Sequence, residues 1–224
     1  MRFSRRNRVN RVLAIVLAVA VFFCILTASI GLPIYIRPFY YLHIEALDLP
    51  GVSGFAADQI RDAYNEVLDY LTLPGREFGT GDMIYSESGK AHFEDCKFLF
   101  DLNAGILLLS LTVVIVLMIL RKANRIGPLE IGGHGSAYWG AVGAVGIPVV
   151  IGGLAAMDFD RAFVIFHSIF FPGKDNWRFS WNEDQIIRVL PQQFFMNCAI
   201  LIGAGILVFS LGVMTADLLR HRQK

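Results

Sequence analysis

The chain has few cysteines, and their positions suggest no pairing. Only Cys24, Cys96 and Cys198 occur among 224 residues, so a disulfide framework is not expected. A quinone-linked thiol oxidase, which needs paired cysteines outside the membrane, is excluded for the same reason. We interpret all three as small apolar side chains that fill space.

Several common catalytic motifs are also missing. The chain has no Gly-x-Ser-x-Gly elbow, no phosphate-binding loop and no Cys-x-x-Cys pair. These absences argue against a serine hydrolase of the elbow type, a P-loop nucleotidase and a thioredoxin-like enzyme. We expect no cofactor and no nucleic-acid partner for this chain.

Charged residues are almost absent from four long stretches, at about 11–32, 102–120, 136–157 and 195–219. Apart from Arg11 at the first boundary, the only Asp, Glu, Lys or Arg within them is Asp217. Each stretch has roughly 20 residues, and a helix of that length rises about 30 Å, which is the thickness of the hydrocarbon core of a bilayer. The sequence therefore predicts an all-α membrane protein with four transmembrane helices.

The distribution of charge predicts the orientation of these helices. The segments before the first stretch, between the second and third, and after the fourth contain almost no acid but many cations: Arg2, Arg5, Arg6, Arg8, Arg11, Arg121, Lys122, Arg125, Arg220, Arg222 and Lys224. By the positive-inside rule both termini are cytoplasmic. The acidic segments 33–101 and 158–194 then face outward as a small, mostly helical extracellular cap, and residues 1–224 form a single membrane domain. The first span is too long for a usual cleaved signal peptide, so we interpret it as a signal anchor.

Apolar spacing predicts helices within the cap. An amphipathic helix is indicated by Ala56, Ile60, Tyr64, Val67, Leu68 and Leu71, and it ends at Pro74-Gly75. A helix that begins near Ser88 continues into the second span. In the other segment we expect a helix over 161–171, capped by Asp158 or Asp160, and a second helix from Ser180-x-x-Glu183 to near Pro191. In the third span, Gly140-x-x-x-Ala144 allows close approach of a neighbouring helix.

Two histidines lie on predicted helices near the outer membrane boundary, one in each outward segment. Ionisable groups at that depth are costly unless they have partners, so His92 and His167 are candidates for function. Asp95 follows His92 at i+3 and is able to raise its basicity. The aromatic neighbours Phe166 and Phe170 are expected to lower the pKa of His167 by desolvation. Two imidazoles tuned in opposite directions are a plausible acid–base pair.

Two other interpretations of these residues remain open. Each histidine alone is also typical of interfacial packing. A metal site built from His92, Glu94, Asp95 and His167, as in a metal-dependent membrane hydrolase, is a further alternative, although the chain offers no close His-x-x-x-His pair there. We expect no bound metal.

Two motifs resemble those of a known bacterial family. The stretch 88–95, Ser-Gly-Lys-Ala-His-Phe-Glu-Asp, resembles the His-x-Glu-Asp element before the second span of the lipoprotein intramolecular transacylases. The stretch 166–171, Phe-His-Ser-Ile-Phe-Phe, followed by Trp177 and by Leu190-Pro191-x-x-Phe194-Phe195, resembles their second signature. The likeness extends over almost the whole chain through the order of spans and outward segments.

The resemblance implies acyl transfer in the bacterial plasma membrane. Enzymes of this family move the sn-2 acyl chain of a diacylglyceryl lipoprotein to the α-amine of its N-terminal cysteine, which gives the lyso form. The substrate partners would then be a diacylated lipoprotein and membrane lipid. The resemblance places His92 and His167 as the catalytic pair at the boundary of cap and membrane, in either order of base and acid. We expect Asp95, Glu94 and Trp177 to support them, and a pocket lined by Tyr35, Phe166, Phe170, Phe171 and Trp181.

The residues beside the first motif leave the substrate open. Ala91 and Cys96 are less typical of the family pattern, so a divergent member with another substrate is compatible with the sequence. The alternative from another class is a non-catalytic membrane chaperone or interaction protein of the cell envelope. The two classes differ in whether His92 and His167 are needed for lipoprotein conversion.

Overall fold

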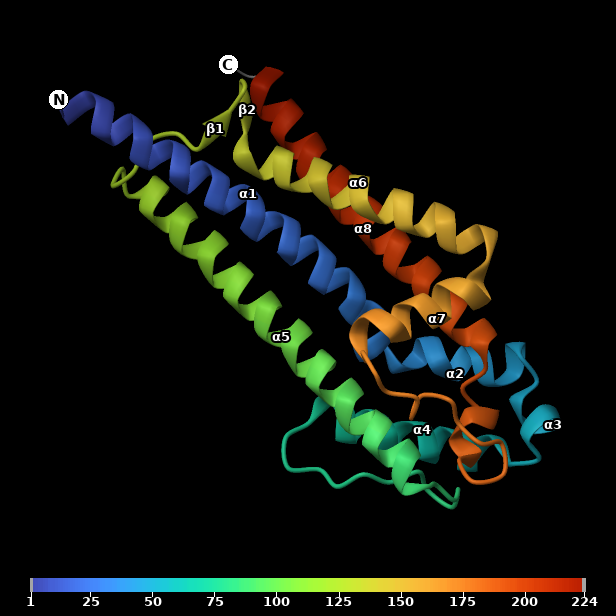
Figure 1. The fold of residues 1–224 in the computed structure, drawn as a ribbon. Helices are drawn as coiled ribbons and strands as arrows, with labels where there is room; N and C mark the ends of the chain where they lie inside the picture. The colour runs from blue at the N-terminus through green and yellow to red at the C-terminus, as the bar shows by residue number, and fades with distance from the viewer. Residues whose placement is uncertain (1, 223–224) are drawn as a thin grey trace. The chain divides into compact units, whose positions relative to one another are not determined.

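The computed structural model describes residues 2–222, and for residues 2–7, 147 and 149–156 it describes the backbone alone. Most of the chain is helical (Figure 1). Four long helices are α1 (Arg2–Tyr35), α5 (Glu87–Lys122), α6 (Ser136–Met157) and α8 (Gln192–Arg222). The predicted all-α class is confirmed, and each of these helices contains one of the uncharged stretches.

Among the described residues, three helices are long and apolar enough to cross a membrane. They are Arg8–Tyr35 within α1, Glu87–Lys122 and Gln192–Arg222. The span predicted at 136–157 coincides with helix α6, but the side chains at 147 and 149–156, on which that prediction depends, lie outside the described residues.

Shorter elements connect the long helices. They are α2 (Arg37–Ala46), α3 (Leu49–Ser53), α4 (Ala57–Thr72), α7 (Phe159–Phe170), the 3₁₀ turn η1 (Gln185–Arg188), and the strands β1 (Glu130–Ile131) and β2 (His134–Gly135). The two strands pair antiparallel as a small hairpin, with Ile131 opposite His134. Helices α2 and α3 were not predicted from the sequence, although each has a proline in its first turn, where the missing N–H costs no hydrogen bond.

The chain forms two compact units, of which the first comprises Met1–Gly31, Asn103–Gly153 and Leu201–Lys224. Its core joins parts of α1, α5, α6 and α8 through buried apolar residues such as Leu17, Leu117 and Ile206 (Figure 1). Helix α6 approaches α1 so closely that a Cβ on Gly140 would lie 2.3 Å from the carbonyl oxygen of Ala18. The close packing predicted from Gly140-x-x-x-Ala144 is confirmed.

The second unit comprises Leu32–Leu102 and Leu154–Ile200. Helix α4 supplies much of its core, with the buried side chains Ile60, Ala63, Tyr64, Val67, Leu68 and Leu71. The Tyr40 ring from α2 stacks on Tyr64 with a centroid distance of 3.7 Å, and its hydroxyl donates to the Val189 carbonyl at 2.7 Å. The predicted amphipathic helix is confirmed, and it ends before Gly75, whose φ of +70° suits glycine.

Two predicted boundaries in this unit were wrong, and one side chain explains both. The Asp184 carboxylate accepts from the backbone N–H and the hydroxyl of Ser86, at 2.9 and 2.8 Å, and from the backbone N–H of Ser180. Ser86 rather than Ser88 therefore precedes α5, and its hydroxyl accepts from the N–H of Gly89. The helix predicted from Ser180 is reduced to η1, because Asp184 fixes the chain in turns there.

Candidate active site

Helices α5 and α7 carry the two candidate histidines, both of which belong to the second unit. His92 lies in the second turn of α5, and His167 lies in the last turn of α7. The Asp158 carboxylate caps α7 by accepting from the backbone N–H of Arg161 at 2.9 Å. The helix ends at Phe170, with Phe171 as its C-cap, before Gly173, which has a φ of +74°. The prediction of a helix here is confirmed, and Asp158 is its cap.

The structure brings the two predicted histidines together. Their ring centroids lie 5.7 Å apart, with 32° between the ring planes. Both residues are buried, with exposed fractions of 5% for His92 and 6% for His167. The two rings are therefore close enough to belong to one site.

Aromatic side chains surround the pair. The indole of Trp177 stacks on His167 at a centroid distance of 4.4 Å, and the Phe163 ring lies 4.3 Å from it. Phe171 contacts both imidazoles, at 4.9 Å from His92 and 5.6 Å from His167. Phe179 covers another side of His92 at 5.4 Å. The histidines are therefore enclosed by aromatic rings and shielded from solvent, where electrostatic interactions are strong.

A hydrogen bond defines the tautomer of His167. Its Nδ1 lies 2.7 Å from the carbonyl oxygen of Phe163. A carbonyl oxygen only accepts, so Nδ1 carries the proton and the neutral ring keeps its lone pair on Nε2. Burial lowers the pKa of His167 below its ordinary value, while the hydrogen bond to Phe163 acts in the opposite direction. His167 is thus a neutral imidazole with a basic Nε2.

The His92 ring has a different environment. Its Nε2 lies 3.4 Å from the Sγ of Cys96, one helical turn further along α5. Its Nδ1 is buried and makes no hydrogen bond of ordinary geometry with a described residue, and the same holds for the Oδ1 of Asn176, but the two side chains lie close enough to interact. Unsatisfied buried polar atoms are rare and are often found where a protein binds its substrate.

Asp95 does not hydrogen-bond His92, in contrast to the expectation from their i, i+3 spacing. Its carboxylate accepts from Lys174 Nζ at 2.5 Å and from Asn176 Nδ2 at 3.1 Å. The physical reason is that a lysine ammonium outcompetes a buried neutral imidazole for a carboxylate near the surface. Asp95 therefore holds the loop after α7, which positions Asn176 and Trp177 beside the histidines.

The other predicted site residues divide between those that contact the pair and those that do not. Phe166 and Phe171 contact the His167 ring, and Phe170 packs on Phe166 at 4.6 Å. Tyr35 and Trp181 are more than half exposed, and none of the ring contacts of either histidine involves them. Trp181 instead packs against the Arg188 guanidinium.

Glu94 points to the exposed side of α5. Burial, and after it the negative charge of Glu94, raises the pKa of the Tyr70 hydroxyl. Since Asp95 is bound by Lys174, the carboxylates of Glu94 and Asp95 do not converge with the two imidazoles. The metal site proposed from these four side chains is not assembled in the described structure.

Sequence reasoning missed several residues of the pocket. Phe163 precedes His167 by four residues on α7, so helical spacing was a signal that could have placed it beside the imidazole. Phe179, Lys174 and Asn176 lie in a loop without periodicity, and no sequence signal identified them. His43 resembles His167 in donating Nδ1–H to the carbonyl four residues earlier, at 2.7 Å, but its Nε2 accepts from the Asn197 amide at 2.9 Å.

Two comparisons with known proteins found matches. The family described as lipoprotein intramolecular transacylase Lit matches residues 15–195. The solved structure of Lit from Bacillus cereus, a membrane-integral protein, is 22% identical with a TM-score of 0.85, and the match covers 97% of this chain and 100% of that one.

Two variants of the same Bacillus cereus protein also match. A His→Arg variant is 21% identical with a TM-score of 0.83, and the match covers 99% of this chain and 96% of that one. A His→Ala variant is 21% identical with a TM-score of 0.82, and the match covers 100% of both chains. At these identities the structures show a shared fold. No curated protein sequence matches the chain. Because the family match covers most of its length, the chain belongs to the lipoprotein intramolecular transacylase family.

Proposed function

We propose that this protein is an integral membrane acyltransferase that moves the sn-2 acyl chain of a diacylglyceryl lipoprotein to the α-amine of its N-terminal cysteine. The observation that carries the proposal is the buried pair of imidazoles, 5.7 Å apart, in a chain of the transacylase family. The product is a lyso-form lipoprotein. Acid–base catalysis by positioned side chains typically contributes about 10²–10⁴-fold to the rate.

The tautomer of His167 supports a specific division of roles. The α-amine nitrogen attacks the ester carbonyl carbon, and the Nε2 of His167 accepts the proton that the nitrogen loses. The bond between that carbon and the glycerol sn-2 oxygen then breaks, and His167 returns the proton to this oxygen. An amide forms and a free hydroxyl leaves, with no net gain or loss of protons.

His92 is suited to bind the oxygen that becomes negative during the attack. In its neutral form one ring nitrogen carries a proton, and the buried Nδ1 makes no hydrogen bond of ordinary geometry with a described residue. If the Cys96 thiol donates to Nε2, the N–H of His92 is at Nδ1, next to the Asn176 side chain. A fixed donor in such a site stabilises the developing oxyanion.

The aromatic walls serve the same reaction. Trp177, Phe171 and Phe179 exclude water, which would otherwise compete with the amine as nucleophile and favour its charged, unreactive form. Donor ester and acceptor amine belong to one molecule, so holding them in one pocket supplies much of the remaining rate enhancement by orientation. A Ser or Cys nucleophile is not required.

The membrane topology follows from charge and length. We propose four spans, including α6, with both termini in the cytoplasm and the histidines at the extracellular boundary of one membrane domain. In a variant without the three native cysteines, a cysteine at the exposed position Ser88 should react with an impermeant maleimide in intact cells. A cysteine at the exposed position Asn124 should react only after permeabilisation. The reverse pattern contradicts the topology.

The function is tested by His92→Gln and His167→Gln. Each variant is expressed with a model lipoprotein whose N-terminus is analysed by mass spectrometry, and we expect loss of the lyso form at normal protein levels. His43→Gln is the matched control, because His43 repeats the backbone hydrogen bond of His167 outside the proposed site. Conversion at wild-type rate by both active-site variants would exclude the enzyme and favour a non-catalytic envelope protein.

A further inference from the structure

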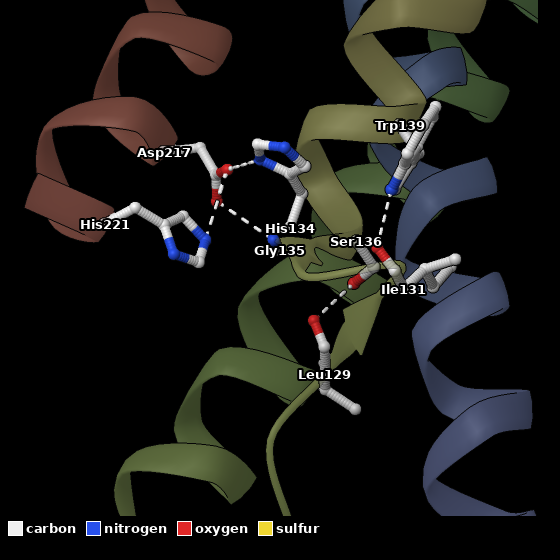
Figure 2. Close-up of polar contacts among 8 residues, drawn as sticks. All are labelled: Leu129, Ile131, His134, Gly135, Ser136, Trp139, Asp217 and His221. Carbon is white, nitrogen blue, oxygen red and sulfur yellow. Dashed lines mark hydrogen bonds and ion pairs between the residues drawn. The ribbon is translucent and has the colours of Figure 1, made fainter. Parts of the chain in front are cut away.

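Three side chains with metal-binding atoms converge in the first unit, which contains neither His92 nor His167. One ligand atom from each of His134, Asp217 and His221 lies within 4.8 Å of the other two (Figure 2). Over the described part of the chain, no other three His, Cys, Asp or Glu residues meet this criterion.

The hairpin β1–β2 positions His134. Its two-residue turn, Gly132-Gly133, has φ values of +58° and +87°, a conformation that glycine adopts without strain. The Trp139 indole donates Nε1–H to the Ile131 carbonyl at 2.8 Å, which holds the hairpin against the start of α6 (Figure 2). The His134 ring also stacks on Tyr138 at 4.4 Å. His134 is therefore held from two sides.

Helix α8 supplies the other two side chains. Asp217 and His221 are four residues apart and so lie on one helical face. The backbone N–H of Gly135 donates to one carboxylate oxygen of Asp217, Oδ1, at 3.0 Å. The second oxygen, Oδ2, faces both imidazoles, at 2.9 Å from His134 Nδ1 and 3.7 Å from His221 Nε2. Such support of a ligand by neighbouring groups is typical of metal sites.

The two distances to the Asp217 oxygen suit a tetrahedral ion. Ligands about 2.0–2.1 Å from Zn²⁺ at tetrahedral angles are about 3.3 Å from each other, and the two distances to Asp217 Oδ2 bracket this value. Two imidazoles and one carboxylate favour zinc or a similar transition metal over Mg²⁺ or Ca²⁺, which prefer sites made of oxygens.

We propose that His134, Asp217 and His221 bind a divalent transition-metal ion, for which Zn²⁺ is the probe, and that this ion fastens the β1–β2 hairpin to the C-terminal turns of α8. Three protein ligands leave one coordination position for water. The site is independent of the proposed acyl transfer, since none of its residues belongs to the histidine pair.

The test uses the full chain in detergent with any affinity tag removed. After treatment with a chelator and buffer exchange, the protein is incubated with Zn²⁺ and separated by gel filtration. We expect one zinc per chain by elemental analysis and a rise in the unfolding temperature with zinc concentration, because an ion that binds only the folded state stabilises it. Wild-type protein that retains no zinc overturns the proposal.

His221→Gln is the most informative variant, because it removes one ligand and leaves the hydrogen bond between His134 and Asp217 in place. Changing a residue that only supports the ligands typically lowers metal affinity by roughly 10–100-fold. We expect the loss of a ligand in His221→Gln to lower zinc affinity by at least as much. The zinc affinity of Asp217→Asn should fall similarly, and His43→Gln should bind zinc like the wild type. In the Co²⁺-loaded protein, the visible absorption should change in His221→Gln. The proposal is contradicted if His221→Gln has the same zinc affinity and the same Co²⁺ spectrum as the wild type.

Discussion

His167 donates its Nδ1–H to the carbonyl oxygen of Phe163 at 2.7 Å, and this bond determines which of its nitrogens is free to act beside the neighbouring His92. Since Nδ1 is committed to the backbone, Nε2 is the atom able to accept a proton. The four-residue separation places both partners on one face of α7. A contact within α7 thus determines the tautomer of His167, and no long-range contact is needed for it.

The first prediction concerns pH and activity. The pKa of His167 is lowered by burial from its ordinary value of 6.5, so Nε2 stays deprotonated at mildly acidic pH. The substrate α-amine, with an ordinary pKa of about 7.7–8.0, gives one acid limb of the kcat/KM profile, and we expect a second limb, from His167, only below pH 6.5. A limb above pH 6.5 that does not move when the amine pKa of the substrate is changed would contradict His167 as the base. The measurement is a pH series with a synthetic diacylated lipopeptide.

The same lowered pKa predicts the pH dependence of stability. Between the folded and unfolded pKa values the unfolded chain binds more protons at His167 than the folded chain does, so stability increases with pH in that window. The contribution is complete above 6.5 and is lost as the pH falls towards the folded pKa. Thermal unfolding of wild type and His167→Gln at pH 7.5 and 5 should show a weaker pH dependence in the variant. An identical pH dependence of the unfolding temperature in wild type and variant would contradict a lowered pKa of His167.

Trp177 is predicted to control the basicity of His167. Its indole covers the imidazole at 4.4 Å with 27° between the planes, and an aromatic pair of this kind contributes about 0.5–1.5 kcal/mol. Trp177→Ala should admit water, raise the pKa of His167 towards 6.5 and move the His167 limb of the activity profile upward. Trp177→Phe keeps an aromatic ring and should resemble the wild type. An unchanged profile in Trp177→Ala would show that the stacking has no such role.

Asp95 is predicted to act through the loop and not through His92. Exposed or partly exposed ion pairs contribute about 0.2–1 kcal/mol, so we expect Asp95→Asn and Lys174→Met each to reduce the rate several-fold at most. A double-mutant cycle should show coupling between Asp95 and Lys174, which are in contact. Strictly additive effects would mean that the ion pair does not position the loop.

Tyr40→Phe is predicted to destabilise the second unit without affecting the chemistry. The Tyr40 hydroxyl is buried and donates to the Val189 carbonyl at 2.7 Å, and leaving a buried acceptor unsatisfied costs about 1–3 kcal/mol. The unfolding temperature should fall, while the turnover of folded protein remains near that of the wild type. An unchanged unfolding temperature would show that the carbonyl finds another partner.

The sequence predicted the features that depend on local pattern. The long helices follow from uncharged stretches, α4 follows from apolar spacing, and the positions of His92 and His167 on α5 and α7 follow from helix signals. Each of these signals lies within one segment of chain, so one sequence is enough to detect it.

The remaining features depend on contacts between distant segments. Asp184 reaches Ser86 across 98 residues, and Lys174 reaches Asp95 across 79. Helical spacing favoured Asp95 as the partner of His92, because the competing ammonium is far away in sequence. Phe179 enters the pocket from an irregular loop for which no periodicity exists. The side chains that shape the site were therefore the least predictable.

The most direct test of the account is the turnover of the single variants His92→Gln and His167→Gln and of the double variant, measured by mass spectrometry of the lipopeptide N-terminus. Residues that act as one catalytic unit are strongly non-additive. We predict that each single variant loses about 10²–10⁴-fold in rate and that the double variant is no slower than the slower single one. Losses that multiply in the double variant, or wild-type turnover in either single variant, would contradict a shared active centre.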